Sequence, residues 1–448
     1  MNEHDGAATS GKKRESDRTF LLLLGFVYMF NFVDRTLVSV AGEAIRRELH
    51  LSDLQLGLLG GLAFSLFFAA LGIPLARLAE RYSRVLIIAS VTAIWSAMTA
   101  LTGFANSFAM LLICRVGVAI GEAGFTPALV SMLSDRFSER KRAGAFSAIT
   151  FWVPLGAAIS ATAGGWIAQH FGWRWAFIAL GLPGLAIALL VKRMLTEPPR
   201  LHAGEAQDTP PFSQVLRRVG RSPSFLYLTA GSGLVAMVGF GLNLFMIPLL
   251  VRRYGLGLAE AGLIFALSFS IANAFGTLVV GRAADALGQR DIGWFGKGPA
   301  VLLAVTLPMY LLAILQDDWR FFMGFMFVAG ALINAYLPAI MTVTQRLVEP
   351  RMRASAAALH SFGQTVGGLG LGSVTLGYLS DRLAGAAYQG NYAADCRRHA
   401  AAPLCEAASA TGLQHALIAG GLMLLPAIAC YIAAARSLRR ETRSGAPA

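Results

Sequence analysis

Apolar runs of about 20 residues recur twelve times along the chain, separated by short polar segments. A helix needs about 20 apolar residues to cross the hydrocarbon core of a bilayer, whereas the strands of a membrane barrel are about 10 residues long and alternate in polarity. These runs are apolar all round, and irregular backbone is not tolerated in lipid. The pattern therefore predicts twelve transmembrane helices, at 19–41, 54–76, 85–104, 108–132, 143–168, 174–195, 225–250, 258–280, 299–316, 320–344, 354–379 and 413–435.

The longest polar break on the side of the N-terminus is the proline-rich segment 196–224, which separates six runs from six. It predicts an all-α membrane protein with two six-helix bundles. We place the N-terminal bundle at 19–195 and the C-terminal bundle at 225–435. A cytoplasmic linker joins them over 196–224, and cytoplasmic tails lie at 1–18 and 436–448.

Composition and charge support a membrane protein. Of 448 residues, 56% are hydrophobic and 14% are charged, which is more apolar than a soluble domain. Roughly three times as many Lys and Arg residues fall on the side of the N-terminus as on the other side, which predicts that both termini are cytoplasmic. We expect an integral protein of the cell (inner) membrane, a monomer whose partners are the bilayer and a small-molecule or lipid substrate. The basic residues are scattered over short loops, so nucleic acid is not an expected partner.

A short charged pattern occurs after the second run of each half, over 76–84 and over 281–290. Each copy has an acid followed by a basic turn, an arrangement that can hold the next helix through charge pairing. Two copies at equivalent places indicate a duplication. We therefore predict gating roles for Glu80, Arg81, Arg84, Asp285 and Arg290.

These features resemble the major facilitator superfamily, whose loop motif matches both copies, although Ala76 and Ser83 stand where that family usually has Gly. The segments 31–35 (NFVDR), 115–123 (RVGVAIGEA) and 197–200 (EPPR) resemble its Spinster-like branch. The resemblance implies two six-helix bundles around a central cavity and proton-linked alternating access. In animal members it also implies lysolipid or sphingoid-type cargo.

Ionisable residues inside predicted helices are the first functional candidates, because a charge in the hydrocarbon zone usually faces a cavity and has a partner. Asp34 in the first helix and Arg115 in the fourth each lie about 10 Å from the same membrane surface, so they can pair. Glu122 lies two turns beyond Arg115 on nearly the same face. We predict that Asp34, Glu122 and Arg115 couple transport to protons. The alternative is a fixed buried salt-bridge cluster with no role in transport.

The second half has polar rather than charged residues at mid-helix, which suits an amphipathic cargo with its charged head against the first half. For each of these residues, an inter-helical hydrogen bond is the alternative to a ligand contact. The predicted substrate-binding set is Asn31, Arg35, Arg115, Glu122, Asn243, Tyr336, His360 and Gln364.

The sequence favours a proton-coupled secondary transporter over other classes of membrane protein. Its expected cargo is an amphipathic lysolipid or sphingoid-type lipid, with small organic anions or drug-like amphipaths as the alternative. A lipid-modifying enzyme would need a nucleophile, base or metal set, and the sequence shows no such pattern. We expect no cofactor, no metal and no catalytic residue, with protons as the coupling ion. Cys396 and Cys405 share the last outer loop, where an oxidising exterior allows a disulfide.

Overall fold

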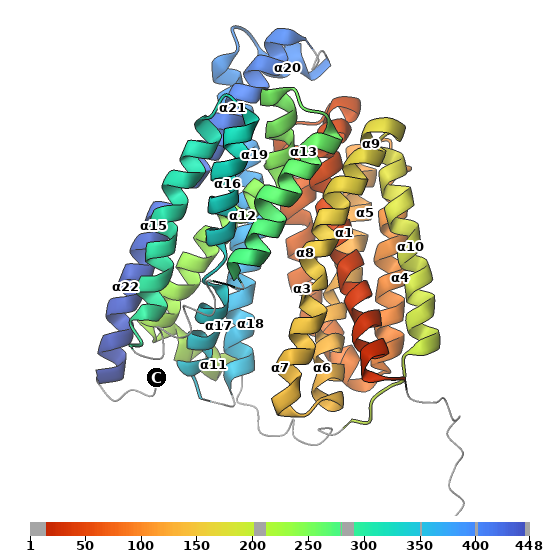
Figure 1. The fold of residues 1–448 in the computed structure, drawn as a ribbon, viewed down its shortest axis with the longest axis vertical. Helices are drawn as coiled ribbons and strands as arrows, with labels where there is room; N and C mark the ends of the chain where they lie inside the picture. Colours follow the sequence, from red (N-terminus) through yellow and green to blue (C-terminus); the bar gives the residue numbers. More distant parts are fainter. Residues whose placement is uncertain are drawn as a thin grey trace, which may run out of the picture.

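The computed structural model describes residues 15–200, 212–277, 279, 291–349, 352–398 and 402–443, and within these ranges it contains helices and no strand. Figure 1 shows two groups of helices side by side, with the first helix starting and the last helix ending at the same end of the molecule. Ten helical stretches in the described part are long and apolar enough to span a membrane. The predicted all-α membrane fold is therefore confirmed.

The N-terminal bundle contains the first six predicted spans, several of them built from consecutive shorter helices. Two spans contain a π-helical turn. Its elements are α1 (Asp17–Leu49), α2 (Asp53–Gly57), the π-turn η1 (Leu58–Leu62), α3 (Ala63–Arg81), α4 (Arg84–Thr102), α5 (Phe108–Ala123), α6 (Phe125–Arg136), α7 (Glu139–Thr150), α8 (Trp152–Ile159), the π-turn η2 (Ser160–Gly164), α9 (Gly165–Phe171) and α10 (Trp173–Met194).

The C-terminal bundle contains the other six spans and follows a short helix, α11, within the predicted linker. Its elements are α11 (Phe212–Gly220), α12 (Pro223–Tyr254), α13 (Leu258–Phe265), the π-turn η4 (Ala266–Ile271), α15 (Trp294–Leu315), α16 (Trp319–Ile333), α17 (Leu337–Arg346), α18 (Arg353–Gln364), the π-segment η6 (Thr365–Gly372), α19 (Ser373–Ala387), α20 (Tyr392–Arg398), α21 (Pro403–Gly421) and α22 (Leu424–Arg443).

The difference between ten long apolar stretches and twelve predicted spans has a local cause. The tenth span is interrupted between α16 and α17, which leaves the 15-residue apolar helix Trp319–Ile333 as its first half. The eleventh span runs through α18, η6 and α19, where Ser, His, Gln and Gly residues lower its hydropathy. Both segments remain helical at the expected places, so the twelve-span arrangement holds.

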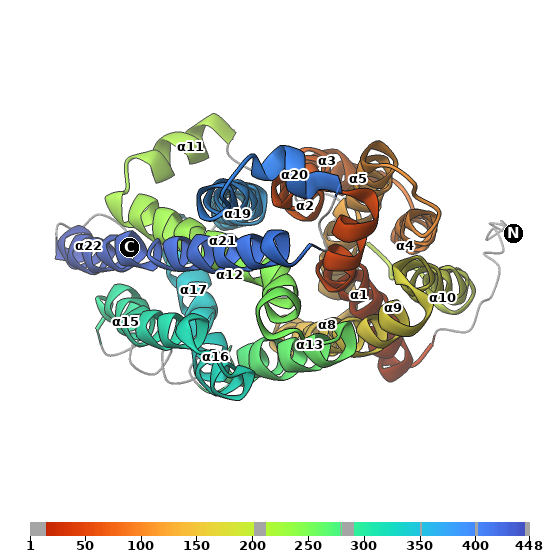
Figure 2. The ribbon, with the colours of Figure 1, turned by 90° about the horizontal axis from the view of Figure 1, so that it is seen from above.

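The two bundles meet at one end of the molecule, which we call the closed end, where α1 and α12 finish. There α1 packs on α12, α2 packs on α19, and α13 packs on η2 and α9. Glycines allow this approach, because a Cβ atom on Gly262 would lie 1.9 Å from the carbonyl oxygen of Ala161. At the other end, which we call the open end, α6 and α7 stand apart from α17 and α18 (Figure 1). Figure 2, seen from above, shows α13 beside α9 and α19 beside α2 at the closed end.

Candidate transport site

The charged residues of α1 and α5 meet inside the N-terminal bundle. Arg35 donates from Nε to Oε2 of Glu122 across 2.5 Å, and the Glu122 side chain has no exposed surface, whereas that of Arg35 keeps 26%. Asn31 lies buried one turn before Arg35 on α1. A buried carboxylate is costly unless it is paired, and Arg35 is the ion-pair partner that Glu122 has here.

Aromatic rings surround the Arg35 guanidinium. Its central carbon lies 5.2 Å from the ring centre of Phe32, 4.9 Å from that of Phe64 and 5.0 Å from that of Phe68. Such rings attract a cation through their negative faces while remaining apolar. The site therefore offers a partly exposed cation that is surrounded by aromatic rings.

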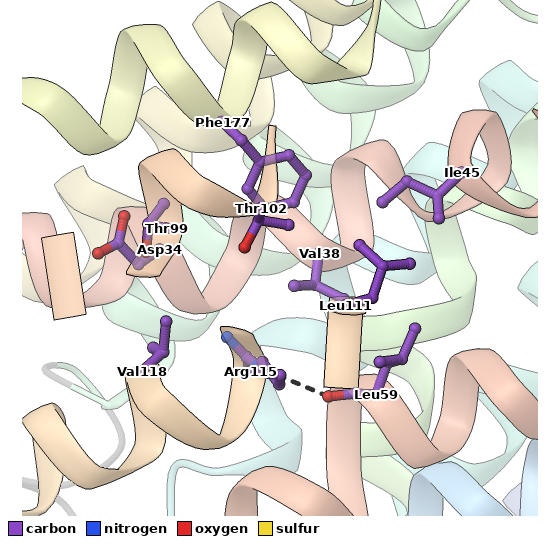
Figure 3. Close-up of a pocket in the computed structure, with 10 residues that line it drawn as sticks. All are labelled: Asp34, Val38, Ile45, Leu59, Thr99, Thr102, Leu111, Arg115, Val118 and Phe177. Atoms are coloured by element: carbon purple, nitrogen blue, oxygen red, sulfur yellow. Dashed lines mark hydrogen bonds between the residues drawn. The ribbon is translucent and has the colours of Figure 1, made fainter. Parts of the chain in front are cut away.

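Arg115 contacts the second span instead of the predicted acid. Its Nε donates to the carbonyl oxygen of Leu59 over 3.3 Å, and its guanidinium lies 4.6 Å from the ring centre of Phe64. Leu59 belongs to η1, and π-turns are frequent at functional sites. Arg115 and Asp34 line the same small cavity (Figure 3) but form no ion pair. The predicted Asp34–Arg115 pair is wrong, because Arg35 is the residue that holds an acid here.

The polar candidates of the second half do not join this cluster. Tyr336 is buried against the ring of Tyr431, with ring centres 5.4 Å apart. His360 is fully buried, and its Nδ1 shares a 3.1 Å hydrogen bond with the hydroxyl of Thr229. Both residues therefore contact other helices of the C-terminal bundle. This agrees with the alternative given for each of them, an inter-helical contact in place of a ligand contact.

Two further candidates lie nearer the boundary between the bundles. The backbone carbonyl of Asn243 on α12 accepts a 2.5 Å hydrogen bond from the hydroxyl of Ser39 on α1, so this position joins the bundles through its main chain. Gln364 is partly exposed at the end of α18, directly before η6.

Only some of the gating candidates can be placed. Arg84 is buried, pairs with Asp135, and donates from Nε to Glu197 across 2.6 Å. Arg81 is exposed at the end of α3, and Glu80 lies one position earlier on the same helix. Asp285 and Arg290, the candidates of the second half, lie outside the described residues. Arg84 thus ties α4 to α6 and to the start of the linker.

A network at the closed end was missed by sequence reasoning. Arg252, near the end of α12, donates to Glu43 on α1 and to Asp53 on α2, each across 2.7 Å. Asp381 on α19 accepts hydrogen bonds from the backbone amides of Asp53 and Leu54, at 3.0 and 2.9 Å. These contacts cross between the bundles and hold the closed end together. Their only signal in the sequence is a set of charges near the ends of predicted helices.

The last loop at the closed end carries the predicted cysteines, and the structure joins Cys396 and Cys405 in a disulfide with their Cα atoms 5.4 Å apart.

In the part of the chain that the structure describes, no three His, Cys, Asp or Glu side chains gather as a metal site would require. The interaction that the charged residues of the site show is the ion pair of Arg35 with Glu122.

Comparisons with known proteins agree with this geometry. The profile of the Major Facilitator Superfamily matches residues 24–370. An MFS-type efflux pump of Mycolicibacterium smegmatis is 35% identical over 368 residues, covering 81% of this chain and 84% of the pump. A probable L-galactonate transporter of Escherichia coli is 31% identical over 171 residues, 38% of each chain. The crystal structure of a bacterial homolog of the human lysosomal transporter Spinster, inward-facing and unoccupied, matches with a TM-score of 0.86 at 31% identity, covering 96% of this chain and 99% of that one.

Proposed function

The chain belongs to the Major Facilitator Superfamily, in its Spinster-like branch, and we propose that it is a secondary transporter that couples the movement of its cargo to protons by alternating access. The observation that carries this proposal is the Arg35–Glu122 pair. It places a carboxylate and a cation together in the hydrocarbon zone, where ionisable residues normally serve ion or substrate pathways.

The pair provides a way to link the binding of a proton to the binding of a cargo anion. Glu122 remains charged only while Arg35 neutralises it, and its second oxygen, Oε1, has no hydrogen-bond partner. A proton on Glu122 removes that charge and releases the Arg35 guanidinium. A phosphate or carboxylate on the cargo can then accept from the same donors. Proton binding and cargo binding are thus linked through one cation.

Helix α1 connects this linkage to the closed end. The same helix carries Arg35 at the site and Glu43 in the network with Arg252. A change of partner at Arg35 therefore acts on an element that also holds the two bundles together. Alternating access needs such a coupling between the occupancy of the site and the contacts that close one end.

An amphipathic lipid with a single charged head, of the lysolipid or sphingoid type, is the cargo that we propose. The partly exposed Arg35 suits an anionic head, and the surrounding rings of Phe32, Phe64 and Phe68 suit an acyl chain. The resemblance of the sequence to the Spinster-like branch implies the same class of cargo. Small organic anions are the second candidate, which the partial similarity to a probable L-galactonate transporter favours.

The function is tested by flux into proteoliposomes under a pH gradient, with lysophosphatidylglycerol, a phosphorylated sphingoid base and galactonate as probes. We expect Glu122→Gln and Asp34→Asn to abolish gradient-driven transport, because neither side chain can then bind and release a proton. Glu260→Gln, a change at an exposed carboxylate on α13, serves as the matched control and should transport normally. Normal coupling in both site variants would establish the fixed salt-bridge alternative instead.

A further inference from the structure

A small cavity lies within the N-terminal bundle, apart from the interface between the two bundles. It has a volume of about 20 Å³, and its lining comes from α1, η1, α4, α5 and α10. Figure 3 shows Asp34 and Thr99 at one end of this lining and Ile45 at the other. All five elements belong to one bundle, so the cavity does not depend on how the two bundles are arranged.

The lining extends from mid-membrane toward the closed end. Ile45 follows Asp34 by eleven positions along α1, which corresponds to about 16 Å along the helix axis. Ile45 lies only four positions before α1 ends at Leu49. The cavity thus leads from the buried carboxyl group of Asp34 toward the end of the molecule at which the bundles are in contact.

One carboxyl oxygen of Asp34 is buried without a hydrogen-bond partner. Its side chain is almost fully buried, with 3% of the residue exposed, and its Oδ1 atom has no hydrogen-bond partner. A buried carboxyl oxygen in this state normally binds water. The cavity volume of about 20 Å³ is sufficient for one water molecule, which needs about 10–15 Å³.

Polar groups that could hold such water continue along the lining. Thr99 and Thr102 on α4 contribute hydroxyl groups, and the hydroxyl of Thr102 donates to the carbonyl oxygen of Met98 at 2.9 Å, which leaves its own lone pairs available. The titratable groups around Asp34 are Arg115 in the lining and Glu122 further along α5. From α10 and η1 the lining is apolar, through Phe177 and Leu59.

A charged cluster lies just beyond the far end of the cavity. Glu48, one turn past Ile45 on α1, accepts a 2.6 Å hydrogen bond from the indole of Trp173 and pairs with Arg174. Its side chain is 48% exposed. Trp173 lies four positions before Phe177 on α10, so this cluster and the cavity lining lie one helical turn apart. An exposed carboxylate is thus positioned to receive protons from solvent at the closed end.

From this geometry we infer that water in the cavity forms the inner part of a proton route, by which Asp34 exchanges protons with the closed end while the cargo reaches Arg35 from the open end. The inference rests on the proposed function, because a proton route has a purpose only in a proton-coupled carrier. It separates the proton and cargo paths in space. A lipid whose head group is bound to Arg35 would then not block protonation of Asp34.

The proton route is tested by substitutions that narrow the cavity or remove polar groups from its lining. Leu111→Phe places a larger side chain into the lining, and Ile113→Phe makes a similar addition on an exposed part of the same helix, where 69% of Ile113 is accessible. A second variant, Thr99→Val with Thr102→Val, keeps the shape of the lining but removes its hydroxyl groups. Its matched control is Thr411→Val. The Thr411 hydroxyl donates to the carbonyl oxygen of Ala407 one turn earlier on α21, as the Thr102 hydroxyl donates to that of Met98 on α4.

The readout is the protonation rate of Asp34 in purified full-length protein, followed by rapid infrared spectroscopy of its carboxyl band after a pH jump and assigned with Asp34→Asn. We expect at least tenfold slower protonation in both cavity variants and unchanged rates in both controls. Unchanged rates in the folded cavity variants would overturn the route while leaving proton coupling intact. An Asp34 carboxyl group that does not titrate at all would overturn the proposed proton-coupling role itself.

Discussion

At the scale of single residues, the position of Arg35 is the most informative feature of the site. The sequence drew attention to the charged residues of α1 and α5 but paired Asp34 with Arg115, whereas the structure pairs Arg35 with Glu122. Rise along a helix gives the depth of a side chain, whereas its direction around the axis depends on how neighbouring helices pack. Here packing turns Arg35 toward Glu122 and leaves Asp34 in the interior of the N-terminal bundle.

We expect Arg35 to dominate the binding of an anionic head group. Arg35→Ala should weaken lysophosphatidylglycerol binding by about tenfold to hundredfold, because a hydrogen bond to a charged group contributes about 1.5–3 kcal/mol. Arg35→Lys should recover only part of the affinity, since an ammonium lacks the planar fork of donors. Equilibrium binding to purified protein measures both.

The matched control is Arg320→Lys, at an exposed arginine that lies 5.6 Å from the ring centre of Trp319 on α16. It should bind lysophosphatidylglycerol as the unaltered protein does. Equal affinity in all of these variants would show that the head group is held elsewhere.

At the scale of elements, hydropathy predicted where helices cross the membrane but not where they are interrupted. The break between α16 and α17 and the π-segments η1 and η6 lie inside apolar runs. A shift of backbone hydrogen bonds by one residue depends on the tertiary surroundings, which a hydropathy pattern does not contain. The consequence for the site is that Arg115 contacts a carbonyl group in η1, a partner that the sequence could not reveal.

The junction of α4 with the linker provides an element-scale prediction. The Glu197 carboxylate accepts from Arg84, from the Val85 amide and from the Ser83 hydroxyl. Partial burial raises the pKa of Glu197, but these hydrogen bonds outweigh it and hold the pKa below its usual 4.5. A lowered pKa means that the stabilisation is complete above pH 4.5 and is lost as the pH falls through the lowered value.

Glu197→Gln should therefore lower the stability of the N-terminal bundle by about 1 kcal/mol at neutral pH. It should also reduce the additional loss of thermal stability that acid causes in the unaltered protein. Thermal unfolding of the purified protein at neutral and acidic pH measures this, with Glu260→Gln as the control at an exposed carboxylate. The same acid sensitivity in Glu197→Gln as in the unaltered protein would rule out this role of Glu197.

At the scale of the whole molecule, the closed end and the site are two parts of one arrangement. Arg252 and Glu43 are 209 positions apart in the chain, yet they join the bundles across 2.7 Å. Contacts between such distant residues follow from how the two bundles meet, so the sequence predicted two bundles but not the residues that close them. The alternation of access that we propose requires this network to break while the contacts within each bundle persist.

The central claim is that the Glu122 carboxylate and an anionic cargo compete for Arg35, so that a proton on Glu122 releases Arg35 to the cargo, and its most direct test is the pH dependence of binding. We predict that lysophosphatidylglycerol binds the unaltered protein at least tenfold more tightly at about pH 5.5 than at about pH 8, because acid releases Arg35 from Glu122. In Glu122→Gln, binding should be tight at both pH values. Binding that is independent of pH in the unaltered protein, or that keeps its full pH dependence in Glu122→Gln, would contradict the claim.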